Sequence, residues 1–340
     1  ASSPHPSPRI SVVMPSFNQA EYLEAALESV LRQGYPDLEL IVIDGGSTDG
    51  SPDILRRYGD RLSHWSSTPD RGQTDAINRG FGMATGEIVA WLNSDDAYLA
   101  GALDGAARAL LDHPHVGMVY ADGVMVDQQG ALLDRHRYRP LETLDLLCFD
   151  VLLQPTVFMR RAALGEVGPL DESYNLIMDH DLWVRFAARH PLLHVSAEWA
   201  AERTHPQAKT VALAAGFVEE AETLIRKAGV DPRLRPMVEA NRQLIRASLD
   251  AFAARRLIDA GDYRGASLRW ARAARTNARV GMRYWYKAVQ AGLSAAGVSR
   301  WFIGYRNLRR SAQHRRAVLV MGESGGVIQA RPGRDALEIQ

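Results

Sequence analysis

The chain has 340 residues, of which 46% are hydrophobic and 24% charged, so it can bury a full core and form more than one domain. Its 40 Lys and Arg equal its 40 Asp and Glu, and this neutral balance excludes a general nucleic-acid binder. The single cysteine, Cys148, excludes an intramolecular disulfide and any multi-cysteine metal site, and it fits a reducing, cytoplasmic compartment.

The first part of the chain predicts strands that alternate with helices. A Pro- and Ser-rich leader, residues 1–8, is expected to be disordered. Apolar strands are predicted at 10–15, 38–44, 62–66, 87–92 and 116–122. Helices are predicted after them, at 20–34, within 45–59, at 74–83 and at 103–111. This alternation of continuous apolar strands with helices predicts an α/β fold with a mainly parallel sheet, covered by helices on both faces.

The later part of the chain changes character. The hairpin-like "MVDQQGALL" and the Pro-containing "LLQPTVFMRR" predict antiparallel additions between residues 123 and 160. "MDHDLWVRFAARH" then predicts a helix and "LLHVSA" a strand, and from about Lys209 only helical patterns follow. We therefore predict an α/β domain over 9–210, an all-helical region over 211–316, and a Gly-rich tail over 317–340 that we expect to be disordered.

The charges are unevenly distributed along the chain. Residues 1–250 hold 23 Lys and Arg against 35 Asp and Glu, whereas residues 251–316 hold 15 against 2. Aromatic and basic residues are also mixed over 283–310. These basic helices either lie peripherally on an anionic membrane near a lipid-linked or phosphorylated acceptor, or they present solvated Arg faces and pack against the preceding domain. The sequence favours neither alternative.

Polar residues follow the predicted strands, at the sheet edge where open α/β folds bind ligands. The strand ends read "PSFN", "DGGSTDG" and "NSDD", and "PDRG" precedes the helix at residue 74. Asp95 and Asp96 can both stay charged when a hard divalent cation such as Mg²⁺ joins them, although helix capping is the alternative for this sequence. Asp44 ends its strand, where a carboxylate can accept from a base N–H or a ribose hydroxyl. The loop lacks G-x-G-x-x-G, which disfavours a nicotinamide cofactor.

Five segments in this order resemble family 2 inverting glycosyltransferases of the GT-A fold, over roughly residues 9–210. They are "SVVMPSFNQAEYLEAALESVLRQ", "LELIVIDGGSTDGS", "DRGQTDAINRG", "EIVAWLNSDD" and "MDHDLW". The resemblance implies a Rossmann-like nucleotide-binding half followed by a mixed acceptor half. It also implies transfer of a sugar from a nucleotide-sugar donor, UDP-linked by our expectation, to a hydroxyl of a glycan or lipid-linked acceptor. The implied cofactor is Mg²⁺ or Mn²⁺.

The resemblance also implies roles for individual residues. The implied donor-binding residues are Pro15, Phe17, Asn18, Asp44, Arg71, Asp75 and Ser94. The implied metal ligands are Asp95, Asp96 and His205, with Asn93 in place of the first Asp of the family's D-x-D motif. Many relatives carry an Arg where this chain has Ile77, so the resemblance implies that diphosphate contact shifts to Arg71 or Arg79, although a surface charge on the helix is the favoured alternative for Arg79. Asp179 takes the position of the catalytic base, supported by Asp181 and Trp183.

Two rival functions stay open at this point. A sugar-phosphate nucleotidyltransferase also uses an α/β sheet and metal-binding carboxylates, but "VVMPSFNQAEY" has neither the Gly-rich loop nor the Lys of that class. A degenerate transferase domain acting as an interaction module would account for Asn93 and the basic C-terminal helices. The sequence predicts neither the oligomeric state nor the identity of the sugar.

Overall fold

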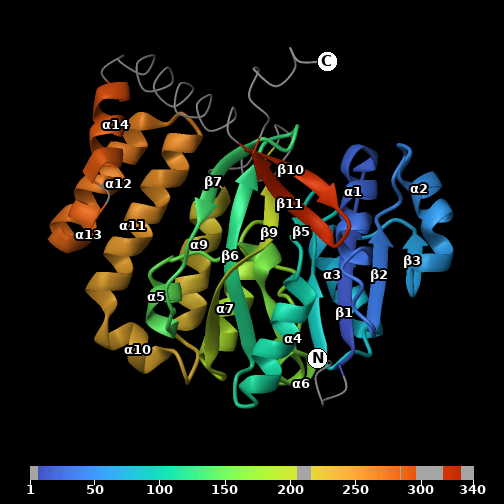
Figure 1. Cartoon of the computed structure of the whole chain (residues 1–340). Helices are drawn as coiled ribbons and strands as arrows, with labels where there is room; N and C mark the ends of the chain where they lie inside the picture. Colours follow the sequence, from blue (N-terminus) through green and yellow to red (C-terminus); the bar gives the residue numbers. More distant parts are fainter. Residues whose placement is uncertain (1–6, 205–215, 284, 296–316, 331–340) are drawn as a thin grey trace, which may run out of the picture.

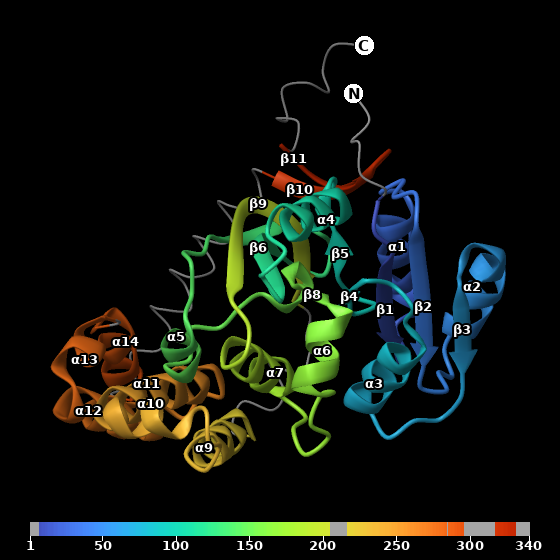
Figure 2. The same cartoon turned by 90° about the horizontal axis from the view of Figure 1, so that it is seen from below.

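The structure, a computed structural model, describes residues 7–204, 216–283, 285–295 and 317–330. Its centre is a nine-stranded sheet with the order β3-β2-β1-β4-β8-β6-β9-β5, and β7 pairs with β6. Helices cover both faces of this sheet, and α10 to α14 gather at the end of the molecule opposite β2 and β3 (Figures 1 and 2). Most of the predicted leader, residues 1–6, lies outside the described residues.

The elements have the following bounds. The strands are β1 Ile10–Ser16, β2 Leu38–Asp44, β3 His64–Ser67, β4 Ile88–Trp91, β5 Ala97–Tyr98, β6 Met118–Val126, β7 Leu132–His136, β8 Phe158–Arg160, β9 Leu192–Arg203, β10 Ala317–Gly322 and β11 Gly325–Ala330. The helices are α1 Ala20–Leu31, α2 Ser51–Tyr58, α3 Gln73–Met83, α4 Ala102–Asp112, α5 Thr143–Leu147, α6 Arg161–Val167, α7 Met178–Ala187, α9 Gly216–Ala228, α10 Arg235–Ala240, α11 Arg242–Asp259, α12 Tyr263–Thr276, α13 Ala278–Arg283 and α14 Trp285–Ala295.

The first half of the sheet is parallel, as predicted, because β1 pairs in parallel with both β2 and β4, and β2 with β3. Successive side chains of a strand point to opposite faces, which splits the apolar runs between two cores. Val13 and Ile41 pack with α3 and α7 on one face, whereas Val12 and Val42 pack with α1 and α4 on the other. Each such fully buried side chain contributes about 1.5–3 kcal/mol of hydrophobic stabilisation.

The second half of the sheet is mixed. The predicted antiparallel additions are confirmed, since β7 and β8 both pair antiparallel with β6. β9 pairs in parallel with β6 and runs to Arg203, six residues beyond the predicted strand. The pairing contains register shifts between Ala121 and Gly123, which lets β9 follow β6 along its length. As a result the end of β9 reaches the same edge of the sheet as the end of β4.

The sequence predicts a disordered tail over 317–340, and the structure corrects this for residues 317–330. β10 and β11 form an antiparallel hairpin that lies across α1 and β5 (Figure 1). The backbone N–H groups of Ala100 and Leu319 donate to Gly326 and Gly130, at 2.9 and 2.8 Å. The glycines that indicated disorder serve the hairpin instead. Gly325 has φ +115°, and a Cβ at Gly326 would lie 2.8 Å from a backbone oxygen.

The C-terminal helices share a core with the sheet. Leu224 of α9 and Ile245 of α11 belong to the same buried cluster as Trp183 of α7, and the rings of Phe149 and Phe252 stack with centroids 4.7 Å apart. Among the described helices, none is both long and apolar enough to cross a membrane. Much of the mixed aromatic and basic stretch, residues 296–316, lies outside the described residues.

Candidate active site

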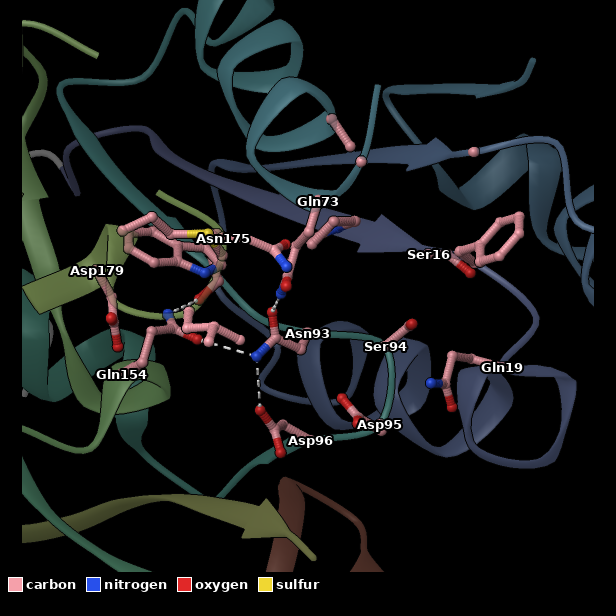
Figure 3. A pocket seen from close by; sticks show the side chains of 18 of the residues that line it. Ser16, Gln19, Gln73, Asn93, Ser94, Asp95, Asp96, Gln154, Asn175 and Asp179 are labelled. Carbon is pink, nitrogen blue, oxygen red and sulfur yellow. Dashed lines mark hydrogen bonds between the residues drawn. The ribbon is translucent and has the colours of Figure 1, made fainter. Parts of the chain in front are cut away.

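A cavity of about 700 Å³ opens at the carboxyl ends of β1 and β4. Its walls come from loops of the parallel half, from the start of α7, from the end of β9 and from α9 (Figure 3). The residues that line it are Pro15, Ser16, Phe17, Gln19, Gly45, Asp70, Gly72, Gln73, Ala76, Trp91, Asn93, Ser94, Asp95, Asp96, Gln154, Asn175, Leu176, Met178, Asp179, Glu202, Arg203 and Phe217. Carboxylates and amides therefore surround a space large enough for a small-molecule ligand.

The loop after β1 supplies an aromatic face to the cavity. Phe17 is 60% exposed and lines the cavity together with Pro15. Asn18 does not line it, since its Oδ1 accepts from the Thr48 backbone N–H at 2.9 Å and its own N–H donates to Ser47 Oγ at 2.7 Å. Asn18 also has φ +52°, a left-handed conformation that Asn tolerates. Asn18 therefore shapes this loop, and Phe17 is the residue that offers a stacking surface.

The carboxylate that ends β2 is used within its own loop. Asp44 is fully buried and accepts from the backbone N–H and the hydroxyl of Ser47 at 2.9 and 2.5 Å, and from Ser67 Oγ at 2.7 Å. Asp70 lines the cavity beside it, with Oδ2 at 2.8 Å from where a Cβ on Gly45 would stand. The carboxylate that faces the cavity here is thus Asp70, and Asp44 holds the loop.

Three charged residues of the third motif, Arg71, Asp75 and Arg79, lie outside the cavity, although Asp70, Gly72, Gln73 and Ala76 of the same segment line it. Arg71 Nη2 donates to Asp75 Oδ1 at 2.6 Å and to Glu172 Oε1 at 3.0 Å. Asp75 is 8% exposed, and the hydrogen bonds from Arg71 lower its pKa. Arg79 Nη2 lies 3.4 Å from Thr68 Oγ1, outside the residues that line the cavity. The structure therefore does not bring Arg71, Asp75 or Arg79 into contact with the space where a donor would lie.

The two carboxylates after β4 differ in orientation. Asp95 lines the cavity beside the buried Ser94. Asp96 is 4% exposed, and its two oxygens accept from the Arg203 backbone N–H at 2.9 Å and from Asn93 Nδ2 at 3.1 Å. Burial, followed by the charge of Asp95, raises the pKa of Asp96 well above its ordinary value. Asp95 is accordingly placed to meet a ligand, whereas Asp96 fixes the strand end to β9.

Asn93 is the centre of an amide network on the cavity wall (Figure 3). Its Nδ2 donates to Asp96 Oδ2 at 3.1 Å and to Gln154 Oε1 at 3.3 Å, and its Oδ1 accepts from Gln73 Nε2 at 2.8 Å. Gln154 Nε2 donates in turn to the Trp91 carbonyl at 2.9 Å. An ionised Asp cannot donate a hydrogen bond. The Asn in this motif is therefore explained by its two donated hydrogen bonds.

The carboxylates of the cavity fit a loosely held divalent ion. Within the described ranges no group of three or more His, Cys, Asp and Glu side chains is close enough to hold a metal, and His205 lies outside those ranges. Mg²⁺ and related ions bind through one or two carboxylates and take further ligands from substrate phosphates. Asp95 faces the cavity and can serve in this way, and Glu202 is a further carboxylate on the same cavity.

Asp179 lies in the first turn of α7 and faces the cavity from the side opposite Ser16 and Gln19 (Figure 3). The backbone N–H of His180 donates to its Oδ1 at 2.7 Å, and burial raises its pKa to about 6. Asp181 points elsewhere and accepts from Arg185 Nε at 2.8 Å, while Trp183 stacks on Trp91 with centroids 5.3 Å apart. Neither Asp181 nor Trp183 lines the cavity. Asp179 is the carboxylate of this motif that can reach a ligand.

Glu202 is a cavity residue that the sequence analysis misses. It is the second-last residue of β9, and burial, then the charges of Asp179 and Asp95, raises its pKa to about 7. The signal that could have found it is the rule that strand ends carry functional side chains. The predicted strand ends six residues before Arg203, so the sequence does not place Glu202 near a strand end.

Glu220 of α9 is a second missed residue, and it holds the segment before Asp179. Its Oε1 accepts from the Asn175 backbone N–H at 3.0 Å, and its Oε2 accepts from those of Leu176 and Ile177 at 2.9 and 3.1 Å. These groups precede the first turn of α7, which a carboxylate also stabilises through the helix dipole. The C-terminal region thereby holds the segment that leads into α7 and Asp179.

Replacing Glu220 by Ala should lower kcat about tenfold to a hundredfold with a smaller change in donor KM, because displacement of about 1 Å at a catalytic group has such effects. Glu220→Gln, which keeps an acceptor oxygen, should retain more activity. The neighbouring exposed Glu219 offers a matched control, and Glu219→Ala should behave as the wild type. Steady-state kinetics on the purified proteins would decide. Equal kcat in the Glu220→Ala and Glu219→Ala variants would contradict the positioning role.

Comparisons with known proteins show which family the chain resembles. The model of the family described as Glycosyl transferase family 2 matches residues 11–167. A PGL/p-HBAD biosynthesis glycosyltransferase of Mycobacterium tuberculosis is 34% identical over 185 residues, which are 53% of this chain and 70% of that protein. An uncharacterized glycosyltransferase of Rickettsia typhi is 30% identical over 228 residues, which are 64% of this chain and 70% of that protein.

Solved structures show the same fold. Residues 1–349 of S. aureus TarS in complex with UDP-GlcNAc superpose with a TM-score of 0.58 at 17% identity, covering 96% of this chain and 97% of that one. The Pyrobaculum calidifontis mannosyltransferase PcManGT in complex with GDP-Man and Mn²⁺ gives a TM-score of 0.57 at 22% identity, covering 92% and 89%. At these identities the likeness concerns the fold alone, which is the predicted GT-A type.

Proposed function

The chain belongs to glycosyltransferase family 2, and we propose that it transfers a single sugar from a nucleotide-sugar donor to an acceptor hydroxyl, with inversion at the anomeric carbon. The observation that carries this proposal is the placement of Asp179 across the cavity from the loop that holds Phe17 (Figure 3). This geometry leaves room for a donor between an aromatic platform and a base. We take the donor to be a UDP-sugar.

Two fold neighbours support a nucleotide sugar as the donor class, because TarS was solved with UDP-GlcNAc and PcManGT with GDP-Man. In this chain Phe17 offers a face on which a base can stack. Asp70, with a carboxylate oxygen against Gly45, can accept from a base N–H, the role that the sequence analysis assigned to Asp44. Donor recognition in this proposal thus combines Phe17, Pro15 and Asp70.

The reaction requires a base for the acceptor and compensation of charge on the leaving diphosphate. Asp179 accepts the proton of the acceptor hydroxyl, whose oxygen attacks the anomeric carbon as the bond to the diphosphate breaks. A pKa of about 6 keeps Asp179 ionised at neutral pH and basic enough to take the proton. A divalent ion held by Asp95 would, when bound, offset the negative charge of the diphosphate. Arg203, which lines the cavity and holds the Asp95 carbonyl at 3.0 Å, keeps this strand end in place.

The acceptor in this proposal is a hydroxyl of a glycan or of a lipid-linked sugar. Asn175, Leu176 and Phe217 line the cavity together with Asp179 and combine an amide with apolar surface. Such a surface suits a sugar ring, which presents hydroxyls at its edge and C–H groups on its faces. The nucleotidyltransferase alternative gains no support, because the loop after β1 offers Pro15, Ser16 and Phe17 in place of a phosphate-binding Lys.

The donor class can be tested directly on the purified chain. UDP- and GDP-sugars are added with and without Mn²⁺, and the melting temperature and release of the nucleotide are followed. A UDP-sugar should raise the melting temperature in a Mn²⁺-dependent way, since ligand at 100 times its Kd stabilises by about 2.7 kcal/mol. If no nucleotide sugar changes the melting temperature or is consumed, the chain is an interaction module and the proposed activity fails.

A further inference from the structure

A second cavity, of about 350 Å³, lies among the C-terminal helices α9, α10, α11 and α12. We call it the arginine groove. Five of the residues that line it are Arg226, Arg242, Arg246, Arg269 and Arg272. The lining also holds two carboxylates, Glu222 and Asp250, and four aliphatic residues, Ile225, Val238, Ile245 and Leu249. Positive charge therefore exceeds negative charge around a partly apolar space.

The two carboxylates form ion pairs with the arginines of α12. Arg269 donates to Asp250 Oδ1 at 3.0 Å and to Glu222 Oε1 at 2.8 Å, and Arg272 Nη1 lies 3.8 Å from the same Asp250 oxygen. Asp250 is 2% exposed, so its buried charge is offset by Arg269 and Arg272. The two carboxylates therefore neutralise the arginines of α12. They form no ion pair with the arginines of α9 and α11.

The arginines of α9 and α11 lack such compensation. In the part of the chain that the structure describes, no ion pair joins Arg226, Arg242 or Arg246 to a carboxylate, and Arg226 only approaches Thr223 Oγ1 at 3.5 Å. Arg242 and Arg246 are four residues apart, so they lie on the same face of α11 and repel each other. An anion bound between them would relieve this repulsion and match the planar donors of their guanidinium groups.

We propose that the arginine groove binds the phosphate group of an amphiphile, with its hydrocarbon part against Ile225, Val238, Ile245 and Leu249. Guanidinium forks recognise phosphate oxygens by paired hydrogen bonds, and aliphatic side chains provide the surface that an alkyl chain covers. Free inorganic phosphate would contact only the arginines and not the aliphatic side chains. The ligand class is therefore a phosphate ester that carries a hydrocarbon chain.

The groove lies on the same helix as one wall of the active site. Phe217 of α9 lines the first cavity and Arg226 lines the groove, nine residues further along. At about 1.5 Å per residue this is roughly 14 Å along the helix axis. Binding in the groove does not depend on the proposed transfer reaction, because no groove residue lines the active-site cavity. Asp179→Asn should therefore bind the same amphiphile as the wild type.

The test compares three ligands on the full chain by isothermal titration calorimetry. Dodecyl phosphate, below its micellar concentration, should bind saturably. Sodium phosphate and dodecyl maltoside, which carry only the head group chemistry or only the chain, should bind much more weakly. Added salt should weaken the binding of dodecyl phosphate, since the contact is electrostatic. Equal binding of sodium phosphate would overturn the apolar part of the proposal, and absence of saturable dodecyl phosphate binding would overturn it entirely.

Variants show whether the groove is the binding site. Arg242→Ala with Arg246→Ala should weaken dodecyl phosphate binding at least about tenfold, because charged hydrogen bonds are the strong ones. The matched control is Arg233→Ala with Arg235→Ala, two exposed arginines nearby that do not line the groove. Both double variants should keep the wild-type melting temperature. Equal loss of binding in the control pair would show non-specific charge attraction and overturn the assignment.

A vesicle measurement then separates the two sources of such a phosphate. Sedimentation with vesicles containing phosphatidylglycerol, but not with phosphatidylcholine alone, would identify a bilayer lipid when the Arg242 and Arg246 substitutions abolish it. Dodecyl phosphate binding without vesicle binding would identify a free amphiphile such as a lipid-linked acceptor. Vesicle binding that persists in the double variant would place membrane contact elsewhere on the chain and overturn the groove as a membrane site.

Discussion

Asparagine in place of Asp179 should lower kcat by about 10²–10⁴ and leave donor binding unchanged, because this range is typical for removal of a general base. Asn is nearly isosteric and still accepts the His180 backbone N–H that holds Asp179 at 2.7 Å. Donor binding is measured by thermal shift, and turnover by nucleotide release. Glu172→Gln removes an exposed carboxylate outside the cavity and should leave kcat unchanged. Undiminished transfer by Asp179→Asn would move the base to another carboxylate, of which Glu202 is the next on the cavity.

The raised pKa of Asp179 predicts that the transfer rate and the stability of the fold both depend on pH. Its pKa of about 6 lies above the ordinary value of 3.8 because of burial and the nearby charge of Glu220. Transfer should therefore fall as pH drops below about 6, where Asp179 is protonated. A raised folded-state pKa means that ionising Asp179 destabilises the fold, and this effect is absent below pH 3.8 and complete above about 6. Asp179→Asn should raise the melting temperature at pH 8 and give no such gain at pH 3.5.

The sequence predicts the parallel half of the sheet well because its strands are continuous apolar runs with helices between them. It fails for residues 317–330, where the three glycines of "GESGG" indicate a flexible tail. The structure uses these glycines for the turn of β10 and β11 and for close contact with the strand before α4. Composition alone does not distinguish a glycine that loosens the chain from one that allows a tight approach.

The site shows a similar division between local and long-range information. Strand ends identify the loops of Phe17, Ser94 and Asp95 correctly, and the resemblance of "MDHDLW" identifies Asp179; all four residues line the cavity. Motif position does not show which way a side chain points. Asp44 turns into its own loop because Ser47 and Ser67 supply donors, and Asp96 turns toward β9. These partners are contributed by segments up to 107 residues away, which no local pattern encodes.

The C-terminal helices are the part of the site that the sequence describes least. Their helical periodicity is predicted, but their attachment to the active site depends on single contacts across the fold. Glu220 holds three N–H groups before α7, and Phe217 closes the cavity wall. The helical region therefore completes the active site. A helical appendage that acted only as an interaction module would not explain this arrangement.

Chelation with EDTA should abolish transfer, and Mn²⁺ or Mg²⁺ should restore it, if Asp95 holds a divalent ion as proposed. Asp95→Asn should lower kcat by about 10²–10³, in the range for loss of one electrostatic group in a closed site, and it should remove the Mn²⁺ dependence of donor binding. The melting temperature should stay near that of the wild type, because this side chain faces the cavity.

Asp96→Asn supplies the matched contrast to Asp95→Asn. Both oxygens of Asp96 accept hydrogen bonds, from the Arg203 backbone and from Asn93 Nδ2. An amide in this buried position sets one N–H₂ group against a donor, and we expect this cost of about 1–3 kcal/mol to exceed the gain from removing a carboxylate whose pKa burial and the Asp95 charge raise. The two adjacent substitutions should therefore have different effects. Asp95→Asn should lower activity, and Asp96→Asn should lower stability. Activity that survives exhaustive chelation would refute the role of Asp95, whereas the effect of Asp96→Asn on stability would stand, since it depends only on the contacts with Asn93 and Arg203.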